Sequence, residues 1–435
     1  MQTTPSSSTA ASAAEEFAVL VAIDWADQKH VWKIYLPDSG RSETGELDHR
    51  PETIETWVLA LASRYPGRRI AVALEQKRGA LTYMLTKYAM LVLHPIHPTS
   101  LHDYRKSFVP SGAKSDDRDV DLILDMLRHH RDRLRPLRPD SPETRMLILL
   151  CEQRRALVDQ RTAMTNQLNS NLKLYFPQVL RWFPDLDSPV VADLLHRWPT
   201  LDSLKSARPA TLRKFFDEHN CRSDQRNQQR TEEIPAAVTA IDDPAVMEAG
   251  QMLTQTLLAL ITVLRKAIDK LDRRIAELFE QHADARIFRS LPRAGAALAP
   301  RLLAALGTDR DRFESADALA AFTGIAPVRK QSGKSCVVVS RLACPKFLRQ
   351  TFHEFAAVSL PGCDWAKQHY ETQRSRGKGH HAAIRSVAHK WIRIIYSVRP
   401  KGVDHQWGKD PSRQLSVGRV ADEQCERVTN HVEAS

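Results

Sequence analysis

The stretch FAVLVAIDWADQKHVWKIYL, residues 17–36, decides the fold of the first part of this chain. It holds two apolar, β-branched runs that only ADQK separates, which predicts an antiparallel hairpin opening a mixed sheet. The first run ends on Asp24, and a later run, RIAVAL, ends in the same way on Glu75. Because open α/β sheets place their sites at the carboxyl ends of strands, we expect both carboxylates at such an edge.

A second pair of acidic residues follows in AKSDDRD, residues 113–119. Asp116 and Asp119 are spaced i, i+3 at the start of the helix-like DVDLILDMLRHH, so their side chains can share one helical face. Oxygen ligands from two strand ends and one helix suit Mg²⁺, and two such ions about 3.5–4 Å apart suit phosphodiester chemistry. Taken singly, each acid is better explained as a helix cap or a solvated turn, and it is their joint occurrence that favours a site.

The length and composition of the chain indicate a globular protein. Its 435 residues are too many for one hydrophobic core, so we expect two or three domains. The longest apolar run, LLALITVL at residues 257–264, is shorter than the about 20 residues that a membrane span needs. Residues 1–16 lack the basic and apolar regions of a secretory signal and are expected to form a disordered leader.

The charge balance favours a polyanionic partner. Lys and Arg number 63 against 52 Asp and Glu, a net charge of +11, and a basic surface gains affinity by releasing the counterions of nucleic acid. The six cysteines are scattered without a CxxC pair. This excludes the usual zinc-finger spacings and favours a reducing cytoplasm.

Changes in composition predict the domain boundaries. The Pro-rich LRPLRPDSPE ends a first domain over residues 17–140. Residues 141–284 are expected to be helical, with one long helix over 142–175 and a second that carries an apolar stripe. The stripe advances in steps of three and four residues: Ile261, Leu264, Ile268, Leu271, Ile275 and Leu278. It fits a parallel coiled coil between two copies, and it also fits packing against the 142–175 helix within one chain.

Residues 285–398 are expected to form a mainly helical domain, and residues 399–435 a polar tail. The stretch SLPRAGAALAPRLLAALG resembles a helix-hairpin-helix, whose turn amides can bind a phosphate. In GIAPVRKQSGKS, Ser332 lies in a turn of small residues flanked by basic ones. The last helical segment combines basic and aromatic residues at a spacing typical of contact with a phosphate backbone.

Together these segments resemble the DEDD transposases of bacterial insertion sequences, the insertion-sequence one-ten family, over residues 18–398. The most specific pieces are AKSDDRD, the SLPRAGAALAPRLLAALG hairpin, GIAP followed by QSG, and the basic last helices. The resemblance implies an α/β domain of the RuvC-like (ribonuclease-H-like) kind with a mixed sheet, a coiled-coil segment and a helical C-terminal transposase domain. It also implies a metal-binding tetrad and an essential serine, at Asp24, Glu75, Asp116, Asp119 and Ser332.

The resemblance further implies a cytoplasmic, nucleoid-associated recombinase that mobilises an insertion sequence. Such an enzyme would use Mg²⁺, two ions per site with Mn²⁺ as a substitute, to cleave and rejoin double-stranded DNA at element ends and target. A structured RNA from the element is expected to choose the sequence, and the chain is expected to form a dimer or tetramer through its coiled coil. The expected nucleic-acid contacts are Lys114, Arg293, Arg329, Lys330, Lys334, Arg341, Arg374, Arg376, Lys378 and Arg385.

Two positions depart from the family pattern, and two other functions stay open. Arg293 stands where family hairpins usually have Gly, and a Gly-Asn pair is missing near Cys344 and Pro345. A RuvC-like endonuclease that hydrolyses junctions with water would need the tetrad but not Ser332. A non-catalytic DNA- or RNA-binding protein is disfavoured, because a binder gains nothing from clustered carboxylates facing phosphates.

Overall fold

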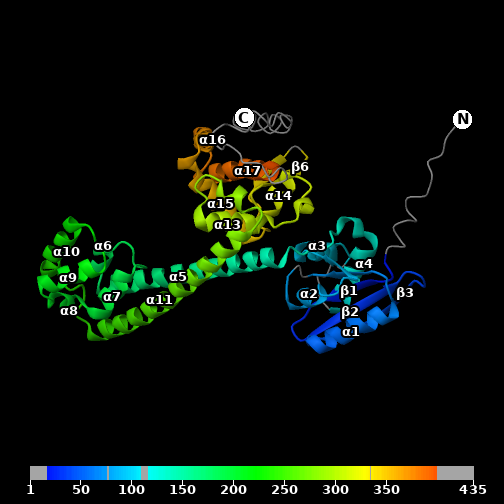
Figure 1. Ribbon diagram of the computed structural model, residues 1–435, viewed down its shortest axis with the longest axis horizontal. Helices are drawn as coiled ribbons and strands as arrows, with labels where there is room; N and C mark the ends of the chain where they lie inside the picture. Colours follow the sequence, from blue (N-terminus) through cyan, green and yellow to red (C-terminus); the bar gives the residue numbers. More distant parts are fainter. Residues whose placement is uncertain (1–16, 76–77, 109–115, 334, 399–435) are drawn as a thin grey trace. The chain divides into compact units, whose positions relative to one another are not determined.

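The computed structural model describes residues 17–75, 78–108, 116–333 and 335–398 (Figure 1). By its internal contacts the chain divides into two compact units, and the boundary lies between Pro139 and Asp140. Unit 1 contains the sheet, and unit 2 is almost entirely helical. The finer division of the second half into a helical segment and a C-terminal domain stays a prediction.

Unit 1 is built on a five-stranded mixed sheet with the strand order β3-β2-β1-β4-β5. The first three strands form an antiparallel meander, and β1, β4 and β5 run parallel to one another. The predicted opening hairpin is confirmed, whereas β3 was not predicted, because its sequence RSETGELD contains a single large apolar residue. The strands are β1 (Leu20–Asp24), β2 (Lys29–Leu36), β3 (Arg41–Asp48), β4 (Ile70–Leu74) and β5 (Leu91–Pro95).

Alternate residues of the central strands serve two separate cores. Val21 and its neighbours point to one face, which α1 covers with Ile54, Val58 and Leu61 at helical spacing. Ala22 and its neighbours point to the other face, which α4 covers. The result is a mixed α/β unit that is compatible with a ribonuclease-H-like arrangement. Its helices are α1 (Pro51–Arg64), α2 (Ala80–Leu85), α3 (Pro98–Phe108) and α4 (Asp116–His129).

Unit 2 is organised by two long helices, α5 (Pro142–Tyr175) and α11 (Pro244–Gln281), which lie side by side and antiparallel (Figure 1). Asn171 fixes their register: its Nδ2 donates to the Gly250 carbonyl at 2.8 Å and to Thr254 Oγ1 at 2.9 Å. These bonds are buried, so a slip of either helix would leave polar groups unpaired.

Packing within one chain accounts for the apolar stripe of α11. Ile261, Ile268, Ile275 and Leu278 are buried. Residues near the start of α5 share a core with the end of α11, and residues near its end share another core with the middle of α11. The structure therefore shows the intrachain alternative, and pairing between copies stays a proposal. Of the described helices, α11 alone is long and apolar enough to cross a membrane on length and composition, and it contributes residues to both cores.

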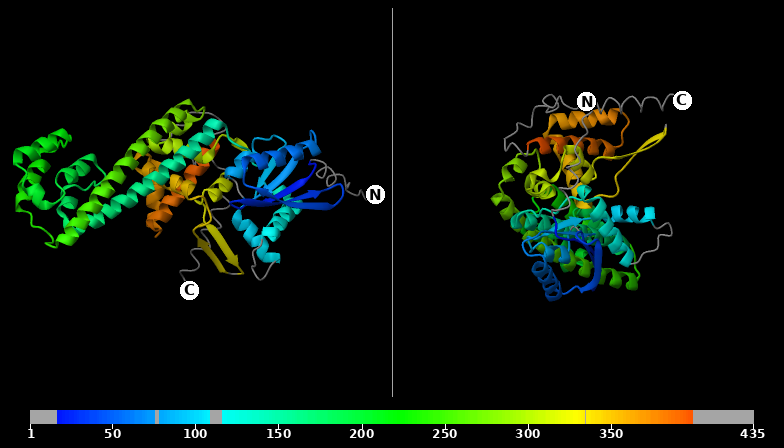
Figure 2. Two further views of the ribbon diagram at one scale, coloured as in Figure 1. Left: turned by 90° about the horizontal axis from the view of Figure 1, so that it is seen from below. Right: turned by 90° about the vertical axis from the view of Figure 1, so that its right-hand side faces the viewer.

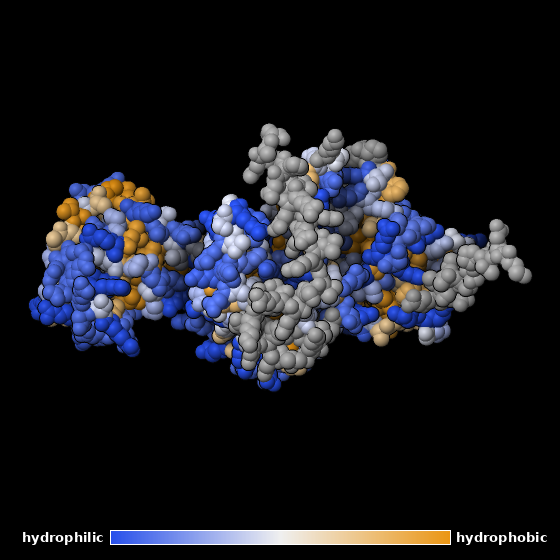
Figure 3. All heavy atoms as spheres, turned by 90° about the horizontal axis from the view of Figure 1, so that it is seen from above, coloured by the Kyte–Doolittle hydropathy of each residue, from blue (hydrophilic) through white to orange (hydrophobic). Residues whose placement is uncertain are grey.

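Five shorter helices close the far end of the long pair, around a core that contains Trp182, Phe215 and Phe216. In Figure 3 the same end shows hydrophobic residues at the surface among hydrophilic ones, and the exposed apolar side chains there include Leu174 and Val238. The five helices are α6 (Gln178–Trp182), α7 (Pro189–Arg197), α8 (Leu201–Lys205), α9 (Pro209–Glu218) and α10 (Asp224–Ala236).

The other end of the long pair belongs to the core of the C-terminal helices, which surround the buried Trp391. A two-stranded hairpin stands out from these helices (Figure 2). The elements are α12 (Ala285–Arg289), α13 (Gly295–Leu306), α14 (Ala316–Phe322), β6 (Val328–Ser332), β7 (Ser335–Val339), α15 (Lys346–Ser359), α16 (Asp364–Ser375) and α17 (His380–Val398).

Ion pairs centred on Glu354 connect α5 to this core. Glu354 of α15 accepts from Arg301 of α13 at 2.6 Å and from Arg155 of α5 at 3.3 Å. Arg301 is only 5% exposed, and among the described residues its Nε and Nη2 find no hydrogen-bond partner. Glu354 is therefore the counter-ion of a buried cation whose hydrogen-bonding capacity is only partly satisfied.

Candidate active site

The sheet brings Asp24 and Glu75 together. Ile23 of β1 is in register with Leu74 of β4, so the next residue of each strand is a carboxylate, on strands about 4.8 Å apart. Side chains alternate along a strand, so Asp24 points to the same face as Ala22, and Glu75 to the same face as Ala73. Both alanines belong to the core that includes residues of α4, which places the two carboxylates on the α4 face of the sheet.

The direction of α4 places its beginning at the same end of the sheet. Asp121 pairs with Lys33, which is in register with Ala22, whereas Arg128 stacks 3.9 Å from the Tyr35 ring, in register with Leu20. The helix therefore runs antiparallel to β1, and its first turn lies towards the Asp24 end. Asp119, in that turn, is 2% exposed.

The described acids have the chemistry of a hard-cation site. Asp24 is 8% exposed, Glu75 is half-buried, and carboxylate oxygens are the ligands that Mg²⁺ prefers. Asp116 begins α4, and its side chain lies outside the description. Among the described side chains, no three His, Cys, Asp or Glu residues come together as a closed metal cluster. The donor set thus fits a divalent cation, although the described side chains do not enclose it.

Arg105, on α3, binds Asp119. Its Nε donates to Asp119 Oδ1 at 2.8 Å, and its Nη2 lies 2.7 Å from the same oxygen in the ion pair. The neighbouring Tyr104 donates its hydroxyl to Asp125, one and a half turns further along α4. Burial and the Asp125 carboxylate raise the pKa of Tyr104 to about 12. Two adjacent residues of α3 therefore hold the face of α4 that carries the site.

A buried histidine, His30, hydrogen-bonds to the loop that follows Asp24. The Ala26 N–H donates to His30 Nδ1 at 3.2 Å, and His30 Nε2 lies 2.8 Å from His49 Nδ1. Since Nδ1 of His30 accepts, its Nε2 carries the proton and donates to His49. Burial, with a smaller effect from His49, lowers the pKa of His30 to about 4. The buried His30 imidazole thus supports the backbone beside the first acid.

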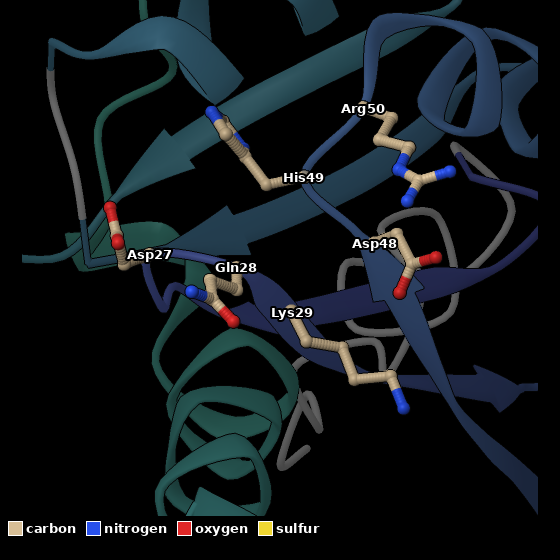
Figure 4. A pocket seen from close by; sticks show the side chains of 6 residues that line it. All are labelled: Asp27, Gln28, Lys29, Asp48, His49 and Arg50. Atoms are coloured by element: carbon tan, nitrogen blue, oxygen red, sulfur yellow. The ribbon is translucent and has the colours of Figure 1, made fainter.

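A surface pocket of about 460 Å³ opens where this loop meets the end of β3 (Figure 4). Its lining mixes both charges, and Lys29 within it already pairs with Glu46. The mixed charge gives the pocket no preference for an anion or a cation. The lining residues are Asp27, Gln28, Lys29, Asp48, His49 and Arg50.

Ser332 lies in unit 2, at the last position of β6, across from Ser335 at the start of β7. The residue is exposed, and Gly333 after it has φ +55°, the left-handed conformation that glycine adopts at tight turns. Within the described part of the chain, no side chain is a hydrogen-bond partner of the Ser332 hydroxyl. A serine hydroxyl is a weak nucleophile, so any attack by Ser332 would need an activating group from elsewhere.

The predicted nucleic-acid contacts include two exposed groups on unit 2. Arg329 and Lys330 are exposed on β6, beside Ser332. Arg374, Arg376 and Lys378 are exposed at the turn between α16 and α17, where Arg374 donates to the Lys378 carbonyl at 2.7 Å. Arg341 and Arg385 are half-buried. Lys114 and Lys334 lie outside the described residues.

The turn between α12 and α13 contains the departure at Arg293. Its φ is +57°, so the backbone keeps a left-handed conformation although the residue is not glycine. Its Cγ and Cδ lie 2.8 Å from where a Cβ on Gly362 would stand, so the stem packs against that glycine. At the second departure, the Cys344 sulfur packs against Gly324.

Sequence reasoning missed three residues at this site: Arg105, His30 and His49. An arginine on a helix and two histidines 19 residues apart carry no motif, because their partners are fixed by the fold. The one available signal was the position of Arg105 on a short helix that directly precedes the acidic one.

Comparison with known proteins matches both halves of the chain to families of transposases. A family model for DEDD transposases of the IS110 type matches residues 21–177, and one for the transposases of the IS116/IS110/IS902 family matches residues 285–371. Together they cover more than half of the chain.

Two relatives align with this chain over most of its length and of their own. The IS117 mini-circle protein of Streptomyces coelicolor is 28% identical over 87% of this chain and 93% of its own length. The 42 kDa protein of insertion element IS900 from Mycobacterium paratuberculosis is 26% identical over 87% of this chain and 95% of its own. With the two model matches, these likenesses show that the chain belongs to the IS110/IS116/IS902 family of DEDD transposases.

Proposed function

We propose that this transposase mobilises an insertion sequence by cleaving and rejoining DNA at a Mg²⁺ site made of Asp24, Glu75, Asp116 and Asp119. DEDD transposases use divalent metal ions in general, and transposases act on DNA. The observation that supports the proposal is that Asp24 at the end of β1, Glu75 directly after β4 and the first turn of α4 lie at the same end of the sheet, on its α4 face. Bound Mg²⁺ would stabilise the charge that develops on phosphate oxygens.

Ser332 is the proposed nucleophile. Its oxygen would attack the scissile phosphorus and lose its proton, and the bond from phosphorus to the departing deoxyribose oxygen would break as that oxygen takes up a proton. The resulting phosphoserine diester conserves the bond for rejoining to a second strand. Exposure of Ser332 beside Arg329 and Lys330 supports this role, because the cations can hold the backbone phosphates.

We place self-association on a second apolar stripe of α11, since the first is buried within the chain. Leu253, Leu260 and Val263 are 45%, 46% and 65% exposed, and with Thr256 they advance in steps of three and four residues. A second copy could cover this stripe in the manner of a coiled coil. The dimer or tetramer so formed could bring the tetrad of one copy to Ser332 of another.

The remaining expectations concern partners and location. A structured RNA from the element is proposed to choose donor and target by base pairing, and the basic residues of unit 2 could bind either nucleic acid. The turn between α12 and α13 is proposed to bind phosphate as a helix-hairpin-helix, in a protein of the bacterial cytoplasm.

Covalent trapping on labelled element-end DNA, with Mg²⁺ and element-derived RNA, tests the proposal. Wild type should form a denaturation-resistant protein–DNA adduct that Ser332→Ala abolishes and Asp116→Ala lowers about a hundredfold or more. Ser335→Ala, directly across the hairpin, and Asp121→Ala, on the exposed side of α4, are matched controls that should keep the adduct.

The other outcomes decide between the alternatives. Cleavage without an adduct, unaffected by Ser332→Ala, would establish water as the nucleophile and the endonuclease as the function. Binding of DNA without cleavage under every condition, in a protein that carries all four acids, would favour the non-catalytic reading.

A further inference from the structure

Arg105 binds a carboxylate that the proposed function assigns to a metal ion. Its Nε donates to Oδ1 of Asp119 at 2.8 Å, and its Nη2 lies 2.7 Å from the same oxygen as an ion-pair contact. The two side chains are 14% and 2% exposed, so this is not a solvent-screened surface pair. A guanidinium on the same carboxylate as a divalent cation is a direct electrostatic competitor for it.

The pairing has a physical reason that does not involve a metal. A carboxylate as buried as that of Asp119 is costly unless a counter-ion and hydrogen bonds compensate the charge. Arg105 supplies both, which keeps the first turn of α4 stable when no cation is present. A cation that replaced it would take over the same compensating role.

We propose that Arg105 is a built-in counter-ion of Asp119 that a divalent cation must displace. The proposal rests on the metal site of the proposed function and deepens it. Because Arg105 competes for Asp119, the protein without DNA binds the cation only weakly. A DNA phosphate arriving at the site attracts both the cation and the released guanidinium, so DNA binding and metal loading strengthen each other.

The surroundings of Arg105 make a clean test possible. Tyr104 holds α3 on α4 through Asp125 independently of Arg105, so the two helices keep a contact when Arg105 is replaced. Lys33 offers a matched control: it pairs with Asp121 on the same helix, and its side chain is 27% exposed. Lys33→Met therefore removes one cation from an α4 aspartate that is not among the proposed ligands.

The experiment is a Mn²⁺ titration of the full chain by calorimetry, without DNA. Arg105→Met should bind Mn²⁺ roughly tenfold more tightly than wild type, whereas Lys33→Met should stay within about twofold. In EDTA the Arg105→Met protein should melt at a lower Tm than wild type, and saturating Mn²⁺ should restore most of that loss. A merely structural arginine would lower Tm without raising Mn²⁺ affinity.

Unchanged or weaker Mn²⁺ binding by folded Arg105→Met, while wild type binds, would overturn this inference and leave the metal site standing. Absence of Mn²⁺ binding in both proteins would overturn the metal site and the inference together. If Arg105→Met does not fold, Arg105→Lys decides: it keeps the charge without the planar fork, and the expected affinity is about threefold above wild type. No gain in that variant would overturn the inference.

Discussion

At the scale of single residues, Arg293 occupies a backbone conformation that suits glycine. A non-glycine residue at φ +57° carries a penalty of about 1 kcal/mol, which packing of its stem against Gly362 partly offsets. Arg293→Ala keeps the penalty and loses the stem, whereas Arg293→Gly removes the penalty. We expect the Gly variant to exceed the Ala variant in free energy of unfolding by about 1 kcal/mol, measured by urea denaturation. The reverse order would show that the turn is not strained.

Also at this scale, His30 should make stability depend on pH. Its pKa of about 4 in the folded state lies below the usual 6.5, so between these values the unfolded chain binds a proton that the folded chain does not. The contribution of His30 to the free energy of unfolding is therefore complete above about pH 6.5 and is lost as the pH falls towards 4. From pH 7 to 5 the loss should be about 2 kcal/mol.

Urea unfolding at pH 7 and pH 5 measures this difference in wild type, His30→Gln and His102→Gln. The glutamine at position 30 should remove most of the pH-dependent loss, because an amide does not titrate in this range. His102 is exposed, so its replacement should leave the loss unchanged. Equal pH dependence in all three proteins would rule out His30 as the titrating group.

At the scale of elements, Glu354 joins three helices. Glu354→Gln keeps the shape of the side chain but leaves the buried Arg301 without a counter-ion. Breaking such a pair should lower the free energy of unfolding of unit 2 by about 3–5 kcal/mol, which differential scanning calorimetry would detect as a lower Tm. Glu371→Gln, at an exposed position of α16, should change stability by less than about 0.5 kcal/mol.

At the scale of the whole molecule, the net charge of +11 should appear in the salt dependence of DNA binding. Each phosphate contact that is lost reduces the slope of log K against log salt by about 1. Arg329→Gln and Lys330→Gln should each reduce it by that amount in filter-binding or fluorescence-anisotropy titrations. Lys214→Gln makes the same change of charge at a lysine that pairs with Glu218. An equal effect of Lys214→Gln would mean that total charge, rather than the hairpin, determines binding.

The sequence predicted what depends on local pattern. The hairpin around Asp24, the helix from residue 142 to 175 and the strand-like run after Ser332 were all marked by apolar periodicity, and the structure confirms them. It missed β3, whose polar residues suit an exposed edge strand. Arg105 was invisible because its partner is 14 residues away on another helix. Whether the α11 stripe faces α5 or a second copy was undecidable, since both partners offer the same apolar surface.

The pairing of α5 with α11 also constrains how relatives of this protein can differ in length. Both helices run between the same two cores, so an insertion in one alone would shift every downstream contact out of register. Matched insertions of seven residues, close to two turns, would keep each stripe on its own side. The distance between the two cores can therefore change only in steps of about 10 Å, so the α5–α11 pair permits a set of discrete lengths rather than a continuous range.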